Sequence, residues 1–441
     1  MVSNQQLSGT LFMQGLDRDI QLASETQTGS IDKILLFELD YRGHHPGYVQ
    51  HLIRYWCEQE FPGQLDILVS PKFMQLHSNI VDMALGCKQK NIRFVAITPE
   101  EEAKLFESAK LANSFTGRIV RAFQEWELLR KYAVSLGTTQ CLIMYLDTVF
   151  LRLAFGAKLP CPFSCIYFRP VFHYSNFANY VPSRRERIWQ LRDKVCLARL
   201  LQNPKLKTLF CLDPIAVEQI NQIDKKTRAV YMPDPVQIYD RAEPQLEELR
   251  QSLSIDAGRQ IFLLFGELTA RKGIYEILDA VEMLPPDLSQ KLCLLLIGPL
   301  GREEKELVQA RIVEITKSRP VQIIGRHEFV TDRDVQPYFQ IADVILAPYQ
   351  RHIGMSAILV RAAAAQKPVL SSDFGLMGEV TRRYGLGLAV DSTAPDEIAK
   401  GFSRFLLESP QSLCDRVQMK QFAERNNAEQ YTKTIFHHLQ S

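Results

Sequence analysis

The stretch ADVILAPYQRHIGMSAILVRAAAAQKPVLSSD, residues 342–373, predicts a strand, a glycine-bearing loop, a helix and a second strand. The apolar run Val344–Leu346 ends at a proline and is typical of a buried parallel strand. Ser356 is expected to cap the following helix through its hydroxyl. Ala362–Ala365 combine high helix propensity with little bulk, so this helix can lie very close to a sheet.

A helix that opens directly off a strand through a glycine loop offers free backbone N–H groups and a positive dipole end. Such a helix terminus is a ready site for an anion, most often a phosphate. The alternative is an ordinary turn of a doubly wound sheet. A second site upstream, described below, favours the phosphate interpretation.

The composition is that of a globular protein long enough for two domains. The chain has 441 residues, 46% hydrophobic and 23% charged, with a net charge of only +2, so global charge does not point to nucleic acid. Nine cysteines without a C-x-x-C pair favour a reducing compartment over a disulfide framework or a zinc site. Neither a transmembrane stretch nor a signal peptide is recognisable, so we expect a cytoplasmic protein.

Strand-like and helix-like segments alternate along the whole chain, which predicts parallel sheets covered by helices on both faces. Residues 1–30 are expected to form a polar extension and residues 31–235 a first α/β domain. The two prolines of Pro233–Pro235 mark the boundary, because neither helix nor strand continues through them. Residues 236–425 would form a second α/β domain, and 426–441 a C-terminal helix that packs back on the first.

The predicted strands are short apolar runs separated by helical patterns. They are Lys33–Leu39, Leu65–Val69, Ile92–Ile97, Cys141–Leu146, Phe163–Phe168, Thr208–Leu212 and Ala229–Met232 in the first half, and Ile261–Phe265, Leu292–Ile297, Val321–Ile324, Val344–Leu346, Val369–Leu370 and Leu386–Val390 in the second. The longest helical pattern runs from about Pro99 to Leu136.

The upstream site is FGELTARKGIYEIL, residues 265–278, in which a strand ends at Gly266 and a helix opens at Gly273. Arg271 and Lys272 lie beside this helix N-terminus, where positive charge is locally unfavourable. Two cations are reasonable there if they face a diphosphate. The alternative is a solvated basic turn.

Five segments in register resemble the donor half of GT-B glycosyltransferases, most closely the retaining glycosyltransferase family 4. They are Gly266–Gly273, LLLIGPL at 294–300, IIGRHEFV at 323–330, ADVILAPY and AAAAQKPVLSSD. The resemblance implies two Rossmann-like, doubly wound domains facing a cleft. It also implies transfer of a sugar from a nucleotide diphosphate sugar, with retention of configuration and no metal or other cofactor.

The resemblance assigns roles to individual positions. Arg271 and Lys272 would grip the diphosphate and neutralise the leaving group. Arg326, Phe329 and Val330 belong to a loop that would receive the nucleotide base.

The resemblance assigns two further turns of the chain to the donor site. Gly354, Met355 and Ser356 would meet the distal phosphate and the sugar. Gly43 and Gly47 would form the glycine loop that covers the diphosphate from the first domain. Between those two glycines, one of His44 and His45 could donate to a phosphate or to the acceptor; the alternatives are that they cap the turn or are merely exposed.

The sequence departs from the family at two places. Family members carry two glutamates where this chain has Ile353 and Arg361, and an arginine can only donate to ribose hydroxyls. Glu379 is a candidate substitute. Where many relatives carry a histidine, this chain offers Asp147, which could contact sugar hydroxyls or act as a base. The alternative is that Asp147 caps a helix.

The basic segment 181–207 carries Ile188, Leu191, Val195 and Ala198 on one helical face. This face would pack on the sheet and leave a solvated basic face, or the segment would lie on an anionic membrane as a peripheral contact or close over an acidic acceptor.

Taken together, these patterns predict a glycosyltransferase whose acceptor is a sugar, glycan, lipid or small metabolite. A non-catalytic scaffold that binds a sugar or a partner, and a nucleotide-sugar hydrolase or epimerase, remain alternatives. A dinucleotide-binding dehydrogenase is disfavoured, since no G-x-G-x-x-G follows the first strand of either half.

Overall fold

The computed structural model describes residues 33–440 apart from 111–114, 178–179, 225 and 227, so the predicted extension 1–30 lies outside the described residues. The chain divides into two compact units. Of the described residues, unit 1 contains those up to His173, those of 182–235 and those from Ala428 onward, and unit 2 contains those of 174–181 and Val236–Asn427.

Unit 1 is built on a parallel sheet of seven strands in the order β3-β2-β1-β4-β5-β6-β7. These are β1 (Lys33–Phe37), β2 (Gln64–Val69), β3 (Ile92–Ala96), β4 (Gln140–Ile143), β5 (Phe163–Tyr167), β6 (Leu206–Cys211) and β7 (Ala229–Tyr231). The strand order reverses between the adjacent strands β1 and β4. In open α/β sheets, ligands bind outside the carboxyl ends of the strands at such a switch point.

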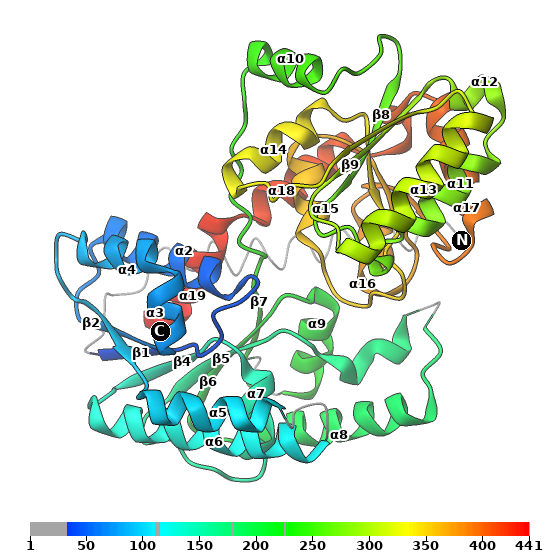
Figure 1. Cartoon of the computed structure of the whole chain (residues 1–441). Helices are drawn as coiled ribbons and strands as arrows, with labels where there is room; N and C mark the ends of the chain where they lie inside the picture. Colours follow the sequence, from blue (N-terminus) through cyan, green and yellow to red (C-terminus); the bar gives the residue numbers. More distant parts are fainter. Residues whose placement is uncertain (1–32, 111–114, 178–179, 225, 227, 441) are drawn as a thin grey trace. The chain divides into compact units, whose positions relative to one another are not determined.

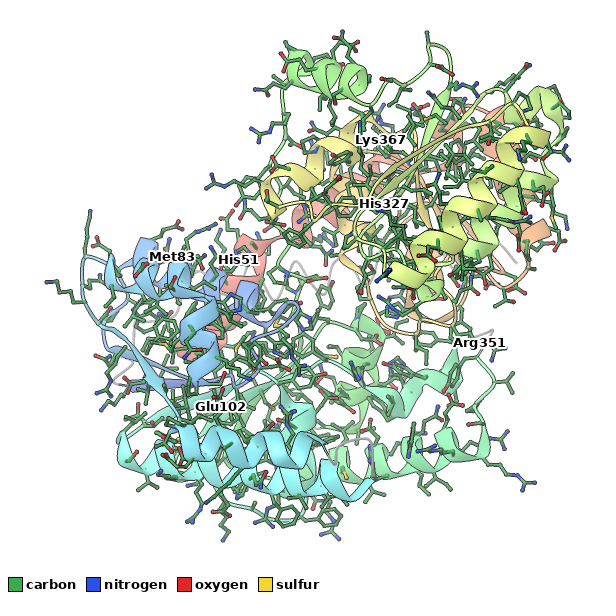
Figure 2. The ribbon with its side chains drawn as sticks, viewed as in Figure 1. His51, Met83, Glu102, His327, Arg351 and Lys367 are labelled. Carbon is green, nitrogen blue, oxygen red and sulfur yellow. The ribbon has the colours of Figure 1, made fainter. Side chains whose placement is uncertain are left out.

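Helices cover both faces of this sheet (Figure 1). One face carries α2 (His45–Gln59), α3 (Pro71–Leu76), α4 (Ser78–Leu85) and α19 (Ala428–Gln440), and the other carries α5 (Pro99–Lys110), α6 (Phe115–Ser135), α7 (Leu146–Ala154), α8 (Arg184–Leu200) and α9 (Pro214–Ile223). In Figure 2, His51 and Met83 lie with the first group and Glu102 with the second.

Unit 2 is built on a parallel sheet of six strands in the order β10-β9-β8-β11-β12-β13, which reverses between β8 and β11. The strands are β8 (Gln260–Phe265), β9 (Leu292–Ile297), β10 (Gln322–Arg326), β11 (Val344–Ala347), β12 (Val369–Ser372) and β13 (Gly387–Val390). Every residue of β9 and β11 is buried, as expected for central strands covered on both faces.

The helices of unit 2 also form two layers (Figure 1). One layer contains α11 (Ile274–Met283), α12 (Pro286–Ser289), α13 (Arg302–Ser318) and α17 (Pro395–Leu407). On the other side, α14 (Asp332–Ile341) packs on β8, α15 (Ala357–Ala364) packs on β11, and α18 (Arg416–Arg425) packs on α15. The remaining helices are α10 (Glu243–Ser252) and α16 (Gly375–Arg383), with 3-10 turns η2 (Val171–Asn176), η3 (Ala270–Lys272) and η4 (Pro410–Leu413).

Several predicted boundaries are corrected by the structure. The helical pattern from Pro99 to Leu136 forms two helices, α5 and α6. The strand predicted over Cys141–Leu146 ends at Ile143, and Leu146 is instead the first residue of α7. The apolar sequence at 144–146 does not show whether a strand continues or a helix begins there, because apolar residues are expected both at the end of a buried strand and at the start of a buried helix.

Candidate functional site

Lys272 is the most buried charged side chain at the switch point of unit 2. It lies in η3, only 7% exposed, and its Nζ donates to the carbonyl of Phe265 at 3.0 Å and to the Tyr349 hydroxyl. Gly266 has a φ of +106°, and a Cβ there would lie 3.0 Å from this Nζ. Gly266 therefore leaves room for the ammonium at the carboxyl end of β8.

Tyr349, which follows β11, links this lysine to the start of α15. Its hydroxyl lies 3.3 Å from the Ser356 Oγ, and its carbonyl accepts from the Ser392 Oγ at 3.0 Å. The Ser392 Oγ also lies 3.0 Å from the Ser372 Oγ at the end of β12, where the Ser372 hydroxyl can donate to it. Ser356 occupies the N-cap position of α15 but makes no capping hydrogen bond, so its predicted cap is wrong. Its hydroxyl instead faces the Tyr349–Lys272 pair.

Arg271 remains exposed beside this network. Its guanidinium lies 5.6 Å from the centroid of the Tyr349 ring, and its carbonyl accepts from the Gln350 N–H at 2.8 Å. Gly273 follows with a φ of +78° and opens α11. A Cβ at Gly273 would lie 2.4 Å from the Pro348 carbonyl oxygen, so the β8 and β11 loops approach closely only because a glycine is there.

The glycine turn at Gly354–Ser356 follows β11 at the same end of the sheet, and the carbonyl of Ile353, just before it, accepts from the Leu376 N–H at 2.8 Å. Arg361 is buried in α15. Its guanidinium donates to Asp332 at 2.5 Å and to the Gln237 carbonyl at 3.2 Å.

Glu379 is the candidate substitute for the missing glutamates, and its Oε2 lies 3.5 Å from the guanidinium of Arg382 on the same helix. The Met355 carbonyl oxygen lies 3.3 Å from the His352 Nε2 and accepts a hydrogen bond from it.

The predicted base-binding loop lies two strands from β8, after β10. Arg326 donates to the Ser252 carbonyl at 3.1 Å, and its own carbonyl accepts from the Gly298 N–H at 2.8 Å. The Phe329 ring is 82% exposed and Val330 is half-buried. An exposed aromatic ring is available to stack on a planar ligand.

The second group of predicted residues lies in unit 1, around a pocket of about 650 Å³ at the carboxyl ends of β1 and β4. The structure brings His44, His45 and Asp147 together there. Gly43, with a φ of +60°, and Gly47 do not line this pocket. Its polar and aromatic lining also includes Glu38, Asp40, Arg121, Glu125, Tyr145, Thr148, Arg169, Trp189 and Arg192.

Glu38 and His45 form a buried pair in this pocket. The His45 Nδ1 lies 2.7 Å from one Glu38 oxygen, and the other oxygen accepts from the Asp40 N–H at 2.9 Å. Burial opposes the charged form of His45, but the hydrogen bond and charge of Glu38 outweigh it and raise the His45 pKa. The His44 ring stacks on the His45 ring with 4.6 Å between their centroids. Burial, together with the charge of His45, lowers the pKa of His44 to about 4.

Asp147 is the second residue of α7, whose N-cap is Tyr145, so the alternative in which Asp147 caps the helix is wrong. Its Oδ2 atom is buried and has no hydrogen-bond partner in the described part of the chain. Burial raises the pKa of Asp147 to about 6, against the opposing charge of Arg169. A carboxyl group with this pKa can accept a hydrogen bond or a proton from a hydroxyl near neutral pH.

Sequence reasoning missed Glu38, Tyr349 and the pocket residues on α6 and α8. Glu38 was inside a predicted strand, although a carboxylate at the carboxyl end of such a strand is itself a signal of a binding site. The others come from distant segments, and only the packing of those segments brings them together.

Helix α8 does not pack its apolar stripe on the sheet, which was one of the predicted arrangements. Ile188 is 68% exposed and Leu191 64%, and Val195 is also exposed. The buried face instead includes Asp193, which accepts from the Tyr167 hydroxyl and the Phe172 N–H. The interpretation that the apolar stripe packs on the sheet is therefore wrong, because the structure satisfies buried polar groups of the sheet with this helix.

Metal-binding clusters and membrane-spanning helices are both absent from the described residues. These residues contain no group of three or more His, Cys, Asp or Glu side chains that could hold a metal ion. Among the same residues, no helix is long and apolar enough to cross a membrane.

Known proteins resemble this chain mainly in structure. HepE from Anabaena, solved in complex with UDP, is 13% identical over 92% of this chain and 99% of its own, with a TM-score of 0.62. The N-terminal domain of Candida albicans trehalose-6-phosphate phosphatase is 13% identical over 94% and 97%, with a TM-score of 0.63. Sucrose-phosphate synthase from Thermosynechococcus elongatus is 16% identical over 92% and 97%, with a TM-score of 0.58.

At the level of sequence, no curated protein matches the chain. Residues 245–426, most of unit 2, match the family described as glycosyl transferases group 1. The fold is therefore that of the GT-B glycosyltransferases, and the match of residues 245–426 to glycosyl transferases group 1 supports a glycosyltransferase enzyme.

Proposed function

We propose that the protein transfers a sugar from a nucleoside diphosphate sugar, with the diphosphate bound at Arg271 and Lys272. The observation that carries this proposal is the placement of Lys272 at the switch point of unit 2, tied to Ser356 through Tyr349. UDP and UDP-glucose are bound by HepE, so a uridine diphosphate sugar is the donor to test first.

The chemistry follows from the charges at this end of the sheet. Cleavage of the glycosidic bond leaves negative charge on the diphosphate, and fixed cations stabilise that charge in the transition state. Arg271 and Lys272 could supply this stabilisation without a metal ion. The departing phosphate would then help to deprotonate the acceptor, with retention of configuration. Arg326, Phe329 and Val330 would contact the base, and Gly354–Ser356 the distal phosphate and sugar.

Turnover of a panel of nucleotide sugars, with and without magnesium, tests this proposal. Lys272→Met keeps the buried volume but removes the charge, and we expect it to lower kcat by about 100-fold or more. Arg271→Ala, at an exposed position, should lower kcat without loss of stability. Lys317→Ala, an exposed lysine of α13, is the matched control and should behave like the wild type.

Three results would change the assignment. Normal kcat in Lys272→Met would refute the role of Lys272. Product formed without any acceptor would identify a hydrolase or epimerase. Binding of UDP without turnover would favour a non-catalytic scaffold, with Ile353 and Arg361 as the relevant departures from the family.

We further propose that the enzyme touches an anionic membrane surface from the cytoplasmic side through α8. The exposed Ile188, Leu191 and Val195 are flanked by exposed arginines, a combination typical of interfacial helices. The nine cysteines are free thiols, as a reducing compartment maintains them. Wild-type protein should co-sediment with phosphatidylglycerol vesicles in a salt-sensitive manner, and the Ile188→Gln/Leu191→Gln variant should not. Equal sedimentation of both proteins would refute the contact.

A further inference from the structure

The pocket of unit 1 contains two arginines that interact with carboxylates at a distance, Arg169 with Asp147 and Arg192 with Asp193, but form no ion pair among the described residues. Arg169 follows β5, Arg192 lies on α8, and both are exposed to solvent. Neither guanidinium has a hydrogen-bond or ion-pair partner among the residues that the structure describes. The third arginine of the pocket, Arg121, is already paired with Glu125 at 2.6 Å. Two available cations therefore face one cavity.

The remaining polar groups of the pocket suit hydroxyls. The buried Asp147 Oδ2 has no hydrogen-bond partner among the residues that the structure describes, and a neutral hydroxyl could satisfy it by donating a hydrogen bond. Glu38 is occupied by His45, which leaves the opposite ring nitrogen of that histidine available to a ligand. Trp189, 37% exposed, adds an aromatic surface for the apolar face of a sugar ring.

Arginine recognises phosphate through parallel N–H donors, and two arginines at one cavity can hold a dianion. A cavity of about 650 Å³ has the size of a small-molecule site. We propose that this pocket binds the acceptor and that the acceptor is a sugar or polyol carrying a phosphate group. This inference rests on the proposed sugar transfer and adds the chemical class of the second substrate.

The phosphate can belong to a free sugar phosphate or to a lipid headgroup, since both present the same chemistry. Helix α8 bears on this choice, because it contributes Arg192 and Trp189 to the pocket and Ile188 and Leu191 to solvent. The headgroup of a lipid-linked acceptor could thus bind in the pocket while its acyl chains remain in a membrane that the exposed face of α8 contacts.

Calorimetric titration of the full chain with glucose 6-phosphate and with glucose tests the phosphate preference. We expect glucose 6-phosphate to bind the wild type at least about tenfold more tightly, the effect of one charge-assisted hydrogen bond. The Arg169→Gln/Arg192→Gln variant should lose this difference. Arg199→Gln, an exposed arginine of α8 outside the pocket, is the control and should keep it.

The inference is overturned if the two sugars bind equally, if neither binds at millimolar concentration, or if the double variant keeps the preference. UDP titrated into the same proteins separates the two proposals. UDP binding without a phosphate preference would remove this inference and leave the proposed function standing. Failure of the wild type to bind any nucleoside diphosphate would instead remove the proposed function.

Vesicles distinguish the two sources of phosphate. Phosphatidylinositol and phosphatidylglycerol carry the same charge, but only the first presents a cyclic polyol phosphate. A preference for phosphatidylinositol that Arg169→Gln/Arg192→Gln abolishes would assign a lipid-linked acceptor. Tight binding of glucose 6-phosphate without any preference between the vesicles would assign a free sugar phosphate.

Discussion

Asp147 shows how a single buried carboxyl group couples stability to pH. Burial raises its pKa from the ordinary 3.8 to about 6, so the native state holds a proton that the unfolded chain releases between these values. The stabilising contribution of this proton is complete below pH 3.8 and is lost as the pH rises through 6. Above that range the buried charge destabilises the native state.

Asp147→Asn should therefore be more stable than the wild type at pH 7.5 and equally stable near pH 4. Melting temperatures of both proteins across this range measure the effect. A constant difference at every pH would show that the carboxyl group does not titrate in this window, and the variant's gain would then need another cause.

Gly273 is required by both its conformation and its surroundings. Its φ of +78° costs a residue with a side chain about 1 to 2 kcal/mol. Gly258 has a similar φ of +81° but no atom near the place of a Cβ. Gly273→Ala should therefore lower the free energy of unfolding by about 1 to 3 kcal/mol more than Gly258→Ala, because its Cβ meets the Pro348 carbonyl. Equal losses in denaturant titrations would show that backbone conformation alone matters.

At the scale of elements, α8 has two faces that the sequence cannot rank. One carries exposed Leu191 and the other carries Leu197, which is 1% exposed. Leu191→Gln should change the free energy of unfolding by less than about 0.5 kcal/mol. Leu197→Ala should cost about 2 to 5 kcal/mol, the usual effect of a core truncation. The opposite ranking would mean that the apolar stripe is the packed face in solution.

At the scale of the whole molecule, the chain completes unit 1 with its last helix. Phe436 on α19 is 2% exposed, and its ring centroid lies 5.5 Å from that of Trp56 and 5.0 Å from that of Phe61. The core of unit 1 therefore joins residues from opposite ends of the chain.

Phe436→Ala should lower the stability of unit 1 by about 3 to 5 kcal/mol. All three tryptophans, Trp56, Trp126 and Trp189, belong to unit 1, so tryptophan fluorescence reports its unfolding directly. Phe155→Ala, at a 67% exposed position of the same unit, is the control. An unchanged fluorescence midpoint in Phe436→Ala would mean that α19 contributes little to this core.

The alternation of strands and helices is readable from local sequence patterns, because buried parallel strands are continuous apolar runs and the apolar residues of helices recur every 3.6 positions. The loop after β8 was also recognisable, since Gly266 and Gly273 flank Arg271 and Lys272 within one short segment. Local patterns of this kind depend only on neighbouring residues.

The tertiary structure alone decided which distant residues share a site. Strand order places β1 beside β4, so Glu38 and Asp147 line one pocket although 109 positions separate 38 from 147. It also decided that α8 turns Asp193 inward and Leu191 outward, because the buried Tyr167 hydroxyl needs an acceptor. Periodicity defines the faces of a helix, but the partners that each face meets are set by the packing of the whole sheet.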